Sequence, residues 1–398
     1  MKIKNSGNSQ MVEALVKPEL LVWGRDSAGF SIELVAKKMQ LKPEKLTSWE
    51  TGSSRPTFNQ LLKLAQIYKR PVAVFYLPSP PKGFSLLQDF RKLPGESSIA
   101  YTPELTYEIR RANFRRETAV QLLEELQGEM DGPTGPGIST TMQESTESFA
   151  KRLRAYLGVG LAEQFAWKGN DGGYDALSHW KEAVESKGVL VFQAANVDVK
   201  EMRGFSIYAQ VLPVIVLNNK DAAVARIFTL IHEFTHLALG SAGICNLNHS
   251  DKVEVYCNGV AGEFLIPKSS FLNEPEIIRK TQLADVADWS DSAISALSKK
   301  YSVSRQVVLR RLQTLSLISS EEYGAKQTAF EQQAAAQLKI KTSGGPTPPV
   351  KAISSAGSLF TRLVLAGYHR EKLTGSDVSE YLNVKVKHFA KIEELVSL

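Results

Sequence analysis

RIFTLIHEFTHLALG, residues 226–240, is the segment around which the rest of the chain is expected to pack. Its apolar residues recur with helical spacing, so it predicts a largely buried helix. Two histidines, His232 and His236, lie four positions apart and therefore on one face of that helix, where both rings can reach one metal ion. Glu233 is turned by about 100° from His232, which places a carboxylate near such an ion without making it a ligand. A general base that takes a proton from water needs this position.

A third protein ligand is expected from the next helical pattern, because catalytic zinc takes three protein ligands and leaves a position for water. Glu254 opens that pattern, which ends at Pro267, and Asn258 follows one turn later on the same face. Asn258 can hold a metal-binding histidine by its other ring nitrogen. The alternative is that His232 and His236 are ordinary core histidines, but a buried polar cluster without a metal would then need other partners.

HEFTHLALG (232–240), followed by EVYCNGVAGEFLIP (254–267), resembles the ImmA/IrrE family of metallo-endopeptidases over about residues 150 to 320. The resemblance implies one Zn²⁺ per chain and a protein substrate. It also implies that His232, His236 and Glu254 are the zinc ligands and that Glu233 is the catalytic acid/base. Gly259 and Gly262 depart from the family pattern, since a helix former is more usual there and each glycine costs a helix about 1 kcal/mol.

The composition is typical of a globular protein with several domains. Of the 398 residues, 43% are hydrophobic and 23% are charged, which is enough apolar material for sizeable cores. Cys245 and Cys257 are the only cysteines, which argues against a disulfide scaffold and for a reducing compartment. Cys257 is expected to be a small buried residue rather than a ligand. The amino-terminal residues lack the apolar core of a signal peptide, and no run of 18 apolar residues occurs, so we expect a cytoplasmic protein without a membrane partner.

Positive charge is concentrated at the start of the chain. Residues 1–78 contain 12 Lys and Arg against 6 Asp and Glu, so they carry the whole net charge of +6. A basic first domain is what binding to the phosphate backbone of a nucleic acid requires. The same residues predict helices at 32–39, capped by Ser31, at 43–50 and at 58–68, with a tight turn between the first two.

The segment SIELVAKKMQLKPEKLTSWETGSSRPTFNQLLKLAQIYKRP, residues 31–71, is similar to the XRE-type helix-turn-helix domain. The resemblance implies that residues 1–78 bind double-stranded DNA. Such domains generally read paired half-sites as dimers, so a homodimer is possible, but the sequence leaves the oligomeric state open. The alternative is an interaction module that no longer binds DNA, since Glu44 and Glu50 weaken the positive face. The residues that the resemblance directs toward the major groove are Lys42, Glu44, Lys45, Thr47 and Ser48, while Arg55 would face phosphate.

The segment 79–148 is predicted to connect the two motifs. It begins with a proline-rich hinge, continues with a charged helix from 103 to about 127, and ends in a flexible loop at 128–141. Glutamates are interleaved with the arginines of this helix, which favours a solvent-exposed helix over a nucleic-acid contact.

The peptidase domain is expected at 149–285, with a helix at 149–156, a helix at 174–187 and then three strands. Of these strands, the one at 203–208 is proposed as a sheet edge that binds extended peptide by strand addition. The other strands are predicted at 189–193 and 211–218.

Three further segments complete the predicted chain: a helix-turn-helix-like segment at 286–340, a linker at 341–354 and a helical region at 355–398. The helix-turn-helix-like segment is expected to be structural or to dock a substrate rather than to read DNA sequence. The predicted fold class is thus multidomain and mainly α with a small β-sheet, combining an amino-terminal helix-turn-helix bundle, an α+β zincin-like core and a helical carboxyl-terminal region.

The predicted function is that of a DNA-binding regulator with zinc-dependent endopeptidase activity. By the family resemblance, its substrate is a repressor-type protein encoded nearby, and cleavage would switch on mobile-element, stress or phage-response genes. One alternative is a transcriptional regulator that uses the peptidase fold as a ligand or metal sensor without cutting. Another is an antitoxin-like protein that binds a toxin.

Overall fold

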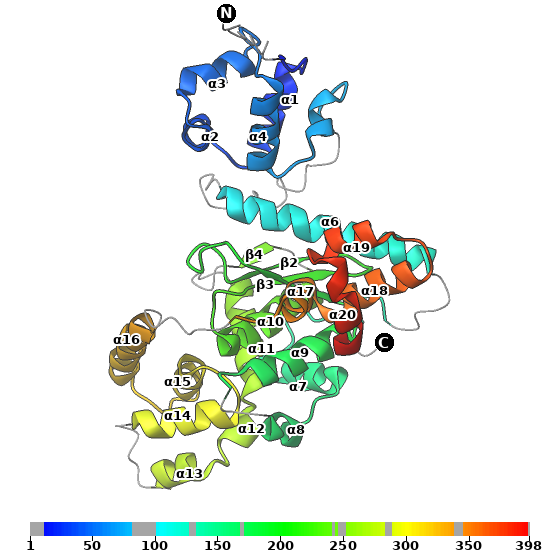
Figure 1. Cartoon of the computed structure of the whole chain (residues 1–398). Coiled ribbons are helices and arrows are strands. Elements are labelled where there is room, and N and C mark those ends of the chain that lie inside the picture. Colours follow the sequence, from blue (N-terminus) through cyan, green and yellow to red (C-terminus); the bar gives the residue numbers. More distant parts are fainter. Residues whose placement is uncertain are drawn as a thin grey trace, which may run out of the picture. The chain divides into compact units, whose positions relative to one another are not determined.

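The computed structural model describes residues 12–81, 101–126, 133–167, 171–240, 243–245, 252–282, 289–337 and 345–396. The chain forms two compact units, Met1–Arg111 and Ala112–Leu398, and each is described by itself. Helices dominate both units, as predicted (Figure 1). Among the described residues, no helix combines the length and the apolarity that a membrane crossing requires.

The first unit begins with a small helical bundle whose local signals are those that the sequence predicted. Ser31 accepts a hydrogen bond from the backbone of Leu34 and starts α2, while Thr57 and Gln60 form a capping box at the start of α4. Helix α1 was not predicted, because it has no side-chain cap. The elements are α1 (Pro18–Asp26), α2 (Ile32–Met39), α3 (Pro43–Glu50), α4 (Phe58–Tyr68) and the 3₁₀ helix η1 (Val72–Tyr76), packed around a core that includes Trp49, Leu61 and Phe75.

The second unit is built around a four-stranded sheet of order β1-β3-β2-β4. The strand at 203–208 was predicted as an edge, and this prediction is wrong, because β2 pairs antiparallel with β3 on one side and with β4 on the other. The short strand β4 follows the metal-motif helix in sequence and carries no strand pattern of its own, so sequence analysis missed it. The strands are β1 (Leu190–Ala194), β2 (Gly204–Ile207), β3 (Val214–Asn218) and β4 (Gly243–Cys245), and β1 runs parallel to β3.

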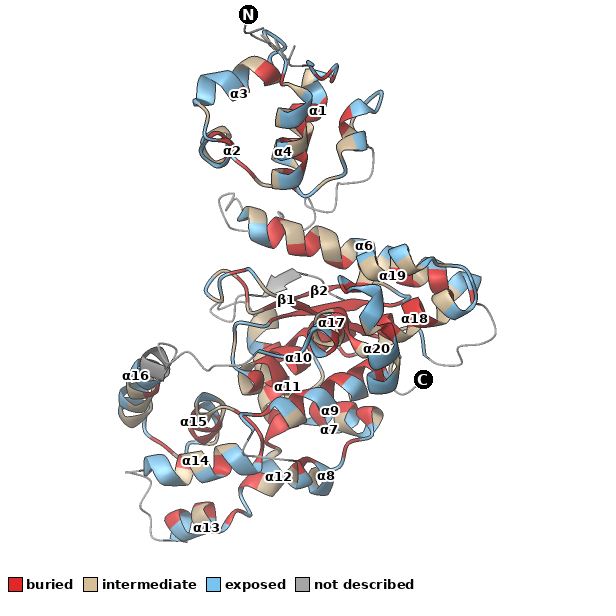
Figure 2. Cartoon of the chain, in the orientation of Figure 1, coloured by how far each residue is buried: buried red, intermediate tan, exposed pale blue. Residues whose placement is uncertain are grey.

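Helices cover both faces of the sheet, so strands β1, β2 and β3 are buried throughout (Figure 2). Side chains alternate between the faces of a strand. Val191 and Ile215 belong to the core shared with α9 (Tyr174–Glu185) and α10 (Ala223–Ala238). Phe192 points the other way and meets Phe360 of α18 (Ser358–His369) with the ring centroids 5.8 Å apart. The helix that carries the metal motif is therefore packed directly against the sheet.

Helix α11 (Lys252–Leu265) packs between α10 and α7 (Thr146–Leu157), and its carboxyl end is firmly held. The last carbonyl groups of a helix lack partners within the helix. Here three side chains from other elements supply them: Arg154 of α7 donates to the carbonyl of Phe264, Gln164 of α8 (Leu161–Ala166) to that of Leu265, and Arg311 of α15 (Arg305–Thr314) to that of Ile266. The helix that carries Glu254 thus has a fixed position.

Helix α6 (Pro103–Glu125) is not the solvent-exposed connector that the sequence suggested. Within the second unit, Arg115 is 3% exposed, lies over the rings of Phe192 and Phe360, and donates to the carbonyls of Ser355 and Tyr381. Arg115 therefore serves packing, because a buried guanidinium can bind several backbone carbonyls at once. The glutamates that stay exposed on the helix are Glu104, Glu117, Glu124 and Glu125.

The segment 128–141 was predicted to be a flexible loop. Its described part, residues 133–141, is instead held by backbone hydrogen bonds. There Thr134 accepts a backbone hydrogen bond from Leu212, and Thr140 donates one to the carbonyl of Ala238. The rest of that loop lies outside the described residues.

The predicted linker at 341–354 is also wrong in its second half, because α17 begins at Pro348 and packs against β1. Proline is favoured in the first helical turn, and the Thr-Pro-Pro sequence that suggested a linker is here a helix start. The remaining helices are α12 (Lys268–Phe271), α13 (Pro275–Gln282), α14 (Asp291–Lys300), α15 (Arg305–Thr314), α16 (Ser320–Gln337), α17 (Pro348–Ala356), α19 (Gly375–Leu382), η2 (Val386–His388) and α20 (Phe389–Val396).

Candidate metal centre

Three side chains from α10 and α11 converge on one point. The Nε2 atoms of His232 and His236 lie 3.1 Å apart. The Glu254 carboxylate faces both rings, with one oxygen 3.2 Å from His232 Nε2 and the other 3.2 Å from His236 Nε2. One ligand atom from each residue lies within 4.8 Å of the others, so a single ion between them could reach all three. Two imidazoles and a carboxylate are a donor set that zinc accepts.

Asn258 lies one helical turn beyond Glu254 and holds one of these rings. Its Oδ1 atom is 3.0 Å from Nδ1 of His232. A side-chain amide oxygen only accepts hydrogen bonds, so Nδ1 carries the proton and Nε2 presents its lone pair to the shared point. This arrangement of an oriented histidine is the one that metal sites use.

The surroundings of His236 favour a positive charge. Burial lowers the pKa of His236, but hydrogen bonds to Cys257 and Glu254 and the charge of Glu233 outweigh burial and raise the pKa to about 11. Groups that stabilise a proton at this point would also stabilise a metal cation there. Cys257 is buried and free, as predicted, and its thiol contacts His236 without belonging to the three-residue cluster.

Glu233 is fully buried on α10, beside the cluster. Burial raises the pKa of its carboxyl group, and the neighbouring His236 and His232 partly counter that effect. Neither carboxylate oxygen has a hydrogen-bond partner of normal geometry among the described residues. A buried carboxylate without partners is costly, and such groups in native proteins usually have a functional reason.

Strand β2 approaches that carboxylate closely, which the sequence analysis did not predict. A Cβ atom on Gly204 would lie 3.3 Å from Oε1 of Glu233 and 2.5 Å from Cγ2 of Thr229. Ser206, two residues along and on the same strand face, is also fully buried near Glu233. Small residues at i and i+2 in an otherwise apolar strand are the signal that could have indicated a close approach.

The sequence did not show which face of α11 carries Tyr256. Its hydroxyl oxygen lies 2.9 Å from Oγ1 of Thr140, which in turn donates to a carboxylate oxygen of Glu144. Tyr256 therefore ties the segment before α7 to α11, and this hydroxyl is engaged away from the histidine pair.

The residues predicted to contact DNA lie on α3 and the turn after it. Lys42, Glu44, Lys45, Thr47 and Arg55 are exposed, while Ser48 is half-buried and its hydroxyl is 2.7 Å from that of Ser54. Glu50, which was expected to weaken the positive face, instead forms a two-pronged ion pair with Arg25 at 2.8 and 2.9 Å. The negative charge of Glu50 is thus neutralised within the bundle, and Glu44 is the acidic residue that stays exposed on α3.

Three arginines of the helix-turn-helix-like segment, which is expected to be structural or to dock a substrate, contact neighbouring side chains. Arg305 lies over the ring of Phe330 and Arg310 over that of Tyr323. Arg311 is buried and pairs with Glu263 of α11. These three arginines therefore attach α15 to its neighbours.

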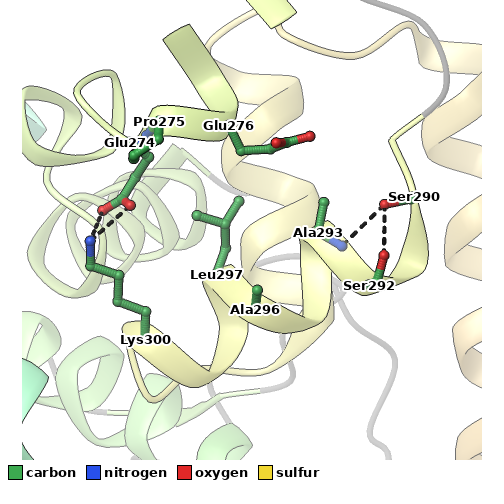
Figure 3. Close-up of a pocket in the computed structure, with 9 residues that line it drawn as sticks. All are labelled: Glu274, Pro275, Glu276, Ser290, Ser292, Ala293, Ala296, Leu297 and Lys300. Carbon is green, nitrogen blue, oxygen red and sulfur yellow. Dashed lines mark hydrogen bonds and ion pairs between the residues drawn. The ribbon is translucent and has the colours of Figure 1, made fainter. Parts of the chain in front are cut away.

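A surface pocket lies between α13 and α14, and none of its lining residues belongs to the histidine cluster (Figure 3). Its charged groups are paired: the carboxylate of Glu274 binds Lys300 at 2.8 Å and accepts a hydrogen bond from the hydroxyl of Tyr301. Ser290 caps α14 through the backbone of Ala293. These groups serve the packing of the helices.

Comparison with known families agrees with both motifs. Residues 23–75 match the family model described as "Helix-turn-helix", and residues 184–313 match the Peptidase M78 model described as "IrrE N-terminal-like domain". A search of curated proteins finds no match to the chain. The first match contains α2, α3 and α4, and the second contains the sheet together with α10 and α11. The chain therefore joins an XRE-type helix-turn-helix domain to a metallopeptidase-type domain of the ImmA/IrrE kind.

Proposed function

We propose that this DNA-binding regulator is a zinc-dependent endopeptidase that cleaves a repressor-type protein. The observation that carries the proposal is the convergence of three donors, His232, His236 and Glu254, beside the partnerless buried carboxylate of Glu233. Both Nε2 atoms and the Glu254 carboxylate face a common point, as the ligands of one ion would.

In this proposal His232, His236 and Glu254 hold the ion and Asn258 orients His232. Zn²⁺, when bound, supplies a Lewis acid that polarises a carbonyl group and makes water acidic near neutral pH. The rigid end of α11, held by Arg154, Gln164 and Arg311, keeps Glu254 at its place. Holding α11 in this way keeps the metal ligands in a fixed arrangement, and metal-assisted hydrolysis needs such preorganised ligands.

Glu233 is the acid/base of the proposed reaction. Its carboxylate accepts the proton of the attacking water and passes this proton to the leaving amine of the cleaved peptide bond. The raised pKa that burial gives this carboxyl group favours the first step, because the carboxylate of a weaker acid is a better proton acceptor.

The amino-terminal domain is proposed to bind double-stranded DNA as part of a homodimer, with Lys42, Lys45 and Arg55 nearest to phosphate and bases. We place this domain at 1–78 and the peptidase domain at 149–285. DNA binding would keep the peptidase near an operator, where a repressor encoded by a neighbouring gene would also be found.

The test is cleavage of the product of the adjacent gene by zinc-loaded protein, with and without single-stranded DNA as a trigger. Wild-type protein should cut it in at least one condition, while Glu233→Gln should show no cleavage and keep its zinc and DNA binding. Cleavage that is unchanged in Glu233→Gln would refute the mechanism. Zinc binding without cleavage of the adjacent product or of a peptide library would favour a non-proteolytic regulator.

A further inference from the structure

The register of the sheet shows which residues of β2 face the metal-motif helix. Ser206 pairs with Ile215 and Gly204 pairs with Leu217. Ile215 and Leu217 both belong to the core that includes α10 residues. Paired residues on neighbouring strands point to the same face of a sheet. Gly204 and Ser206 therefore face α10.

The absence of a side chain at Gly204 leaves room for Thr229 and, next to it, for the carboxylate of Glu233. A side chain at position 204 would collide with Thr229, one helical turn before Glu233, and would come within 3.3 Å of Glu233 Oε1. The approach of helix and strand at this point depends on the absence of a side chain.

Ser206 is the polar residue that β2 directs into the same space. The side chain is completely buried, and its hydroxyl oxygen, like the two Glu233 oxygens, has no hydrogen-bond partner of normal geometry among the described residues. Burial raises the pKa of the Glu233 carboxyl group, and Ser206 counters part of that rise as a hydrogen-bond donor does. An apolar residue at this strand position, between Phe205 and Ile207, would make the folded protein more stable, because burying an unpaired hydroxyl costs free energy.

We propose that Ser206 is a positioning residue for Glu233, whose hydroxyl donates a hydrogen bond to the carboxylate and holds it beside the metal site. This inference rests on the proposed function, because it assigns Ser206 a task in the same reaction. A hydroxyl can turn toward one carboxylate oxygen and leave the other for water. Ser206 itself touches neither metal nor substrate in this assignment.

The test measures binding of acetohydroxamate to the zinc-loaded full chain by calorimetry, so it needs no natural substrate. A hydroxamate chelates zinc and shares its proton with a nearby carboxylate, so its affinity reports whether Glu233 is in place. Ser206→Ala should weaken binding about tenfold, the effect of losing one hydrogen bond to a charged group. Ser206→Thr, which keeps the hydroxyl, should restore most of the affinity.

The matched control is Ser298→Ala, which removes another serine hydroxyl that is bonded to the carbonyl of Val303 at 2.6 Å. This variant should bind the probe like the wild type. In a Glu233→Gln background, Ser206→Ala should cause no further loss, because the two residues act as one unit. Zinc content should stay at one ion per chain in every variant.

The outcomes separate the two proposals. If wild-type protein binds neither zinc nor the probe, the proposed function fails. If the probe binds and Glu233→Gln weakens binding but Ser206→Ala does not, the inference about Ser206 alone is overturned. Equal losses from Ser206→Ala in both backgrounds would likewise overturn it, since they would show a general packing effect.

Discussion

At the level of single residues, the orientation of His232 depends on Asn258. The 3.0 Å contact between Asn258 Oδ1 and His232 Nδ1 fixes which ring nitrogen is protonated. The spacing of Glu254 and Asn258 let the sequence suggest that these two residues share a helix face. The small residues Gly204 and Ser206 could have indicated a close approach to β2, but the sequence does not show that Glu233 lies there, because this depends on how the strand packs against α10.

We expect Asn258→Ala to weaken zinc binding about 10- to 100-fold, because the His232 ring would be free to turn and to move its proton to Nε2. Asn258→Asp keeps an acceptor and should weaken binding less. The measurement is a competition with a coloured zinc chelator. Asn273→Ala is the control, since Asn273 is exposed and bonds only locally to the carbonyl of Ser269. Equal affinity of Asn258→Ala and wild type would rule out this role for Asn258.

At the level of elements, features that depend on local sequence could be predicted, and features that depend on contacts with distant segments could not. The observed bounds of α2, α3 and α4 are the predicted ones. Ser31 marks the start of α2, and Pro43 marks that of α3. The position of β2 within the sheet was predicted wrongly, because it depends on pairing with β4, which lies on the far side of α10 in sequence. Helix α6 was predicted to be solvent-exposed because of its charged residues. Its burial depends on segments more than 200 residues away in the sequence, such as the one whose Ser355 carbonyl binds Arg115.

The ion pair of Arg311 with Glu263, which attaches α15 to α11, is expected to stabilise the folded chain. Both side chains are largely buried. Arg311→Met would leave the Glu263 carboxylate buried without its partner and also remove the hydrogen bond to the Ile266 carbonyl. We expect a loss of about 3 kcal/mol or more in the free energy of unfolding, measured with denaturant.

The double variant Arg311→Met/Glu263→Gln should recover part of that loss, because no uncompensated charge remains. Lys391→Met, which breaks an exposed ion pair with Glu394, is the control and should change stability little. If Arg311→Met were as stable as the control variant, the pair would not hold α15 in place.

At the level of the whole molecule, the two matched domains differ in charge and in chemistry. Residues 1–78 carry the whole net charge of +6, and the donor cluster lies in a balanced remainder. The pairing of Glu50 with Arg25 leaves lysines exposed on α3. DNA affinity and zinc affinity should therefore respond to different substitutions.

We expect Lys42→Ala/Lys45→Ala to weaken binding of double-stranded DNA by the full chain, and more so at low salt, because two positive charges that would face the DNA are lost. The slope of log affinity against log salt concentration should fall by up to about 1.8, since each neutralised phosphate contributes about 0.9. Zinc content should not change. The control variant Lys385→Ala/Lys391→Ala removes the same charge from exposed positions of the carboxyl-terminal region and should keep the wild-type slope. Equal slopes for both double variants would mean that α3 does not face the DNA, and the alternative of an interaction module would then be preferred.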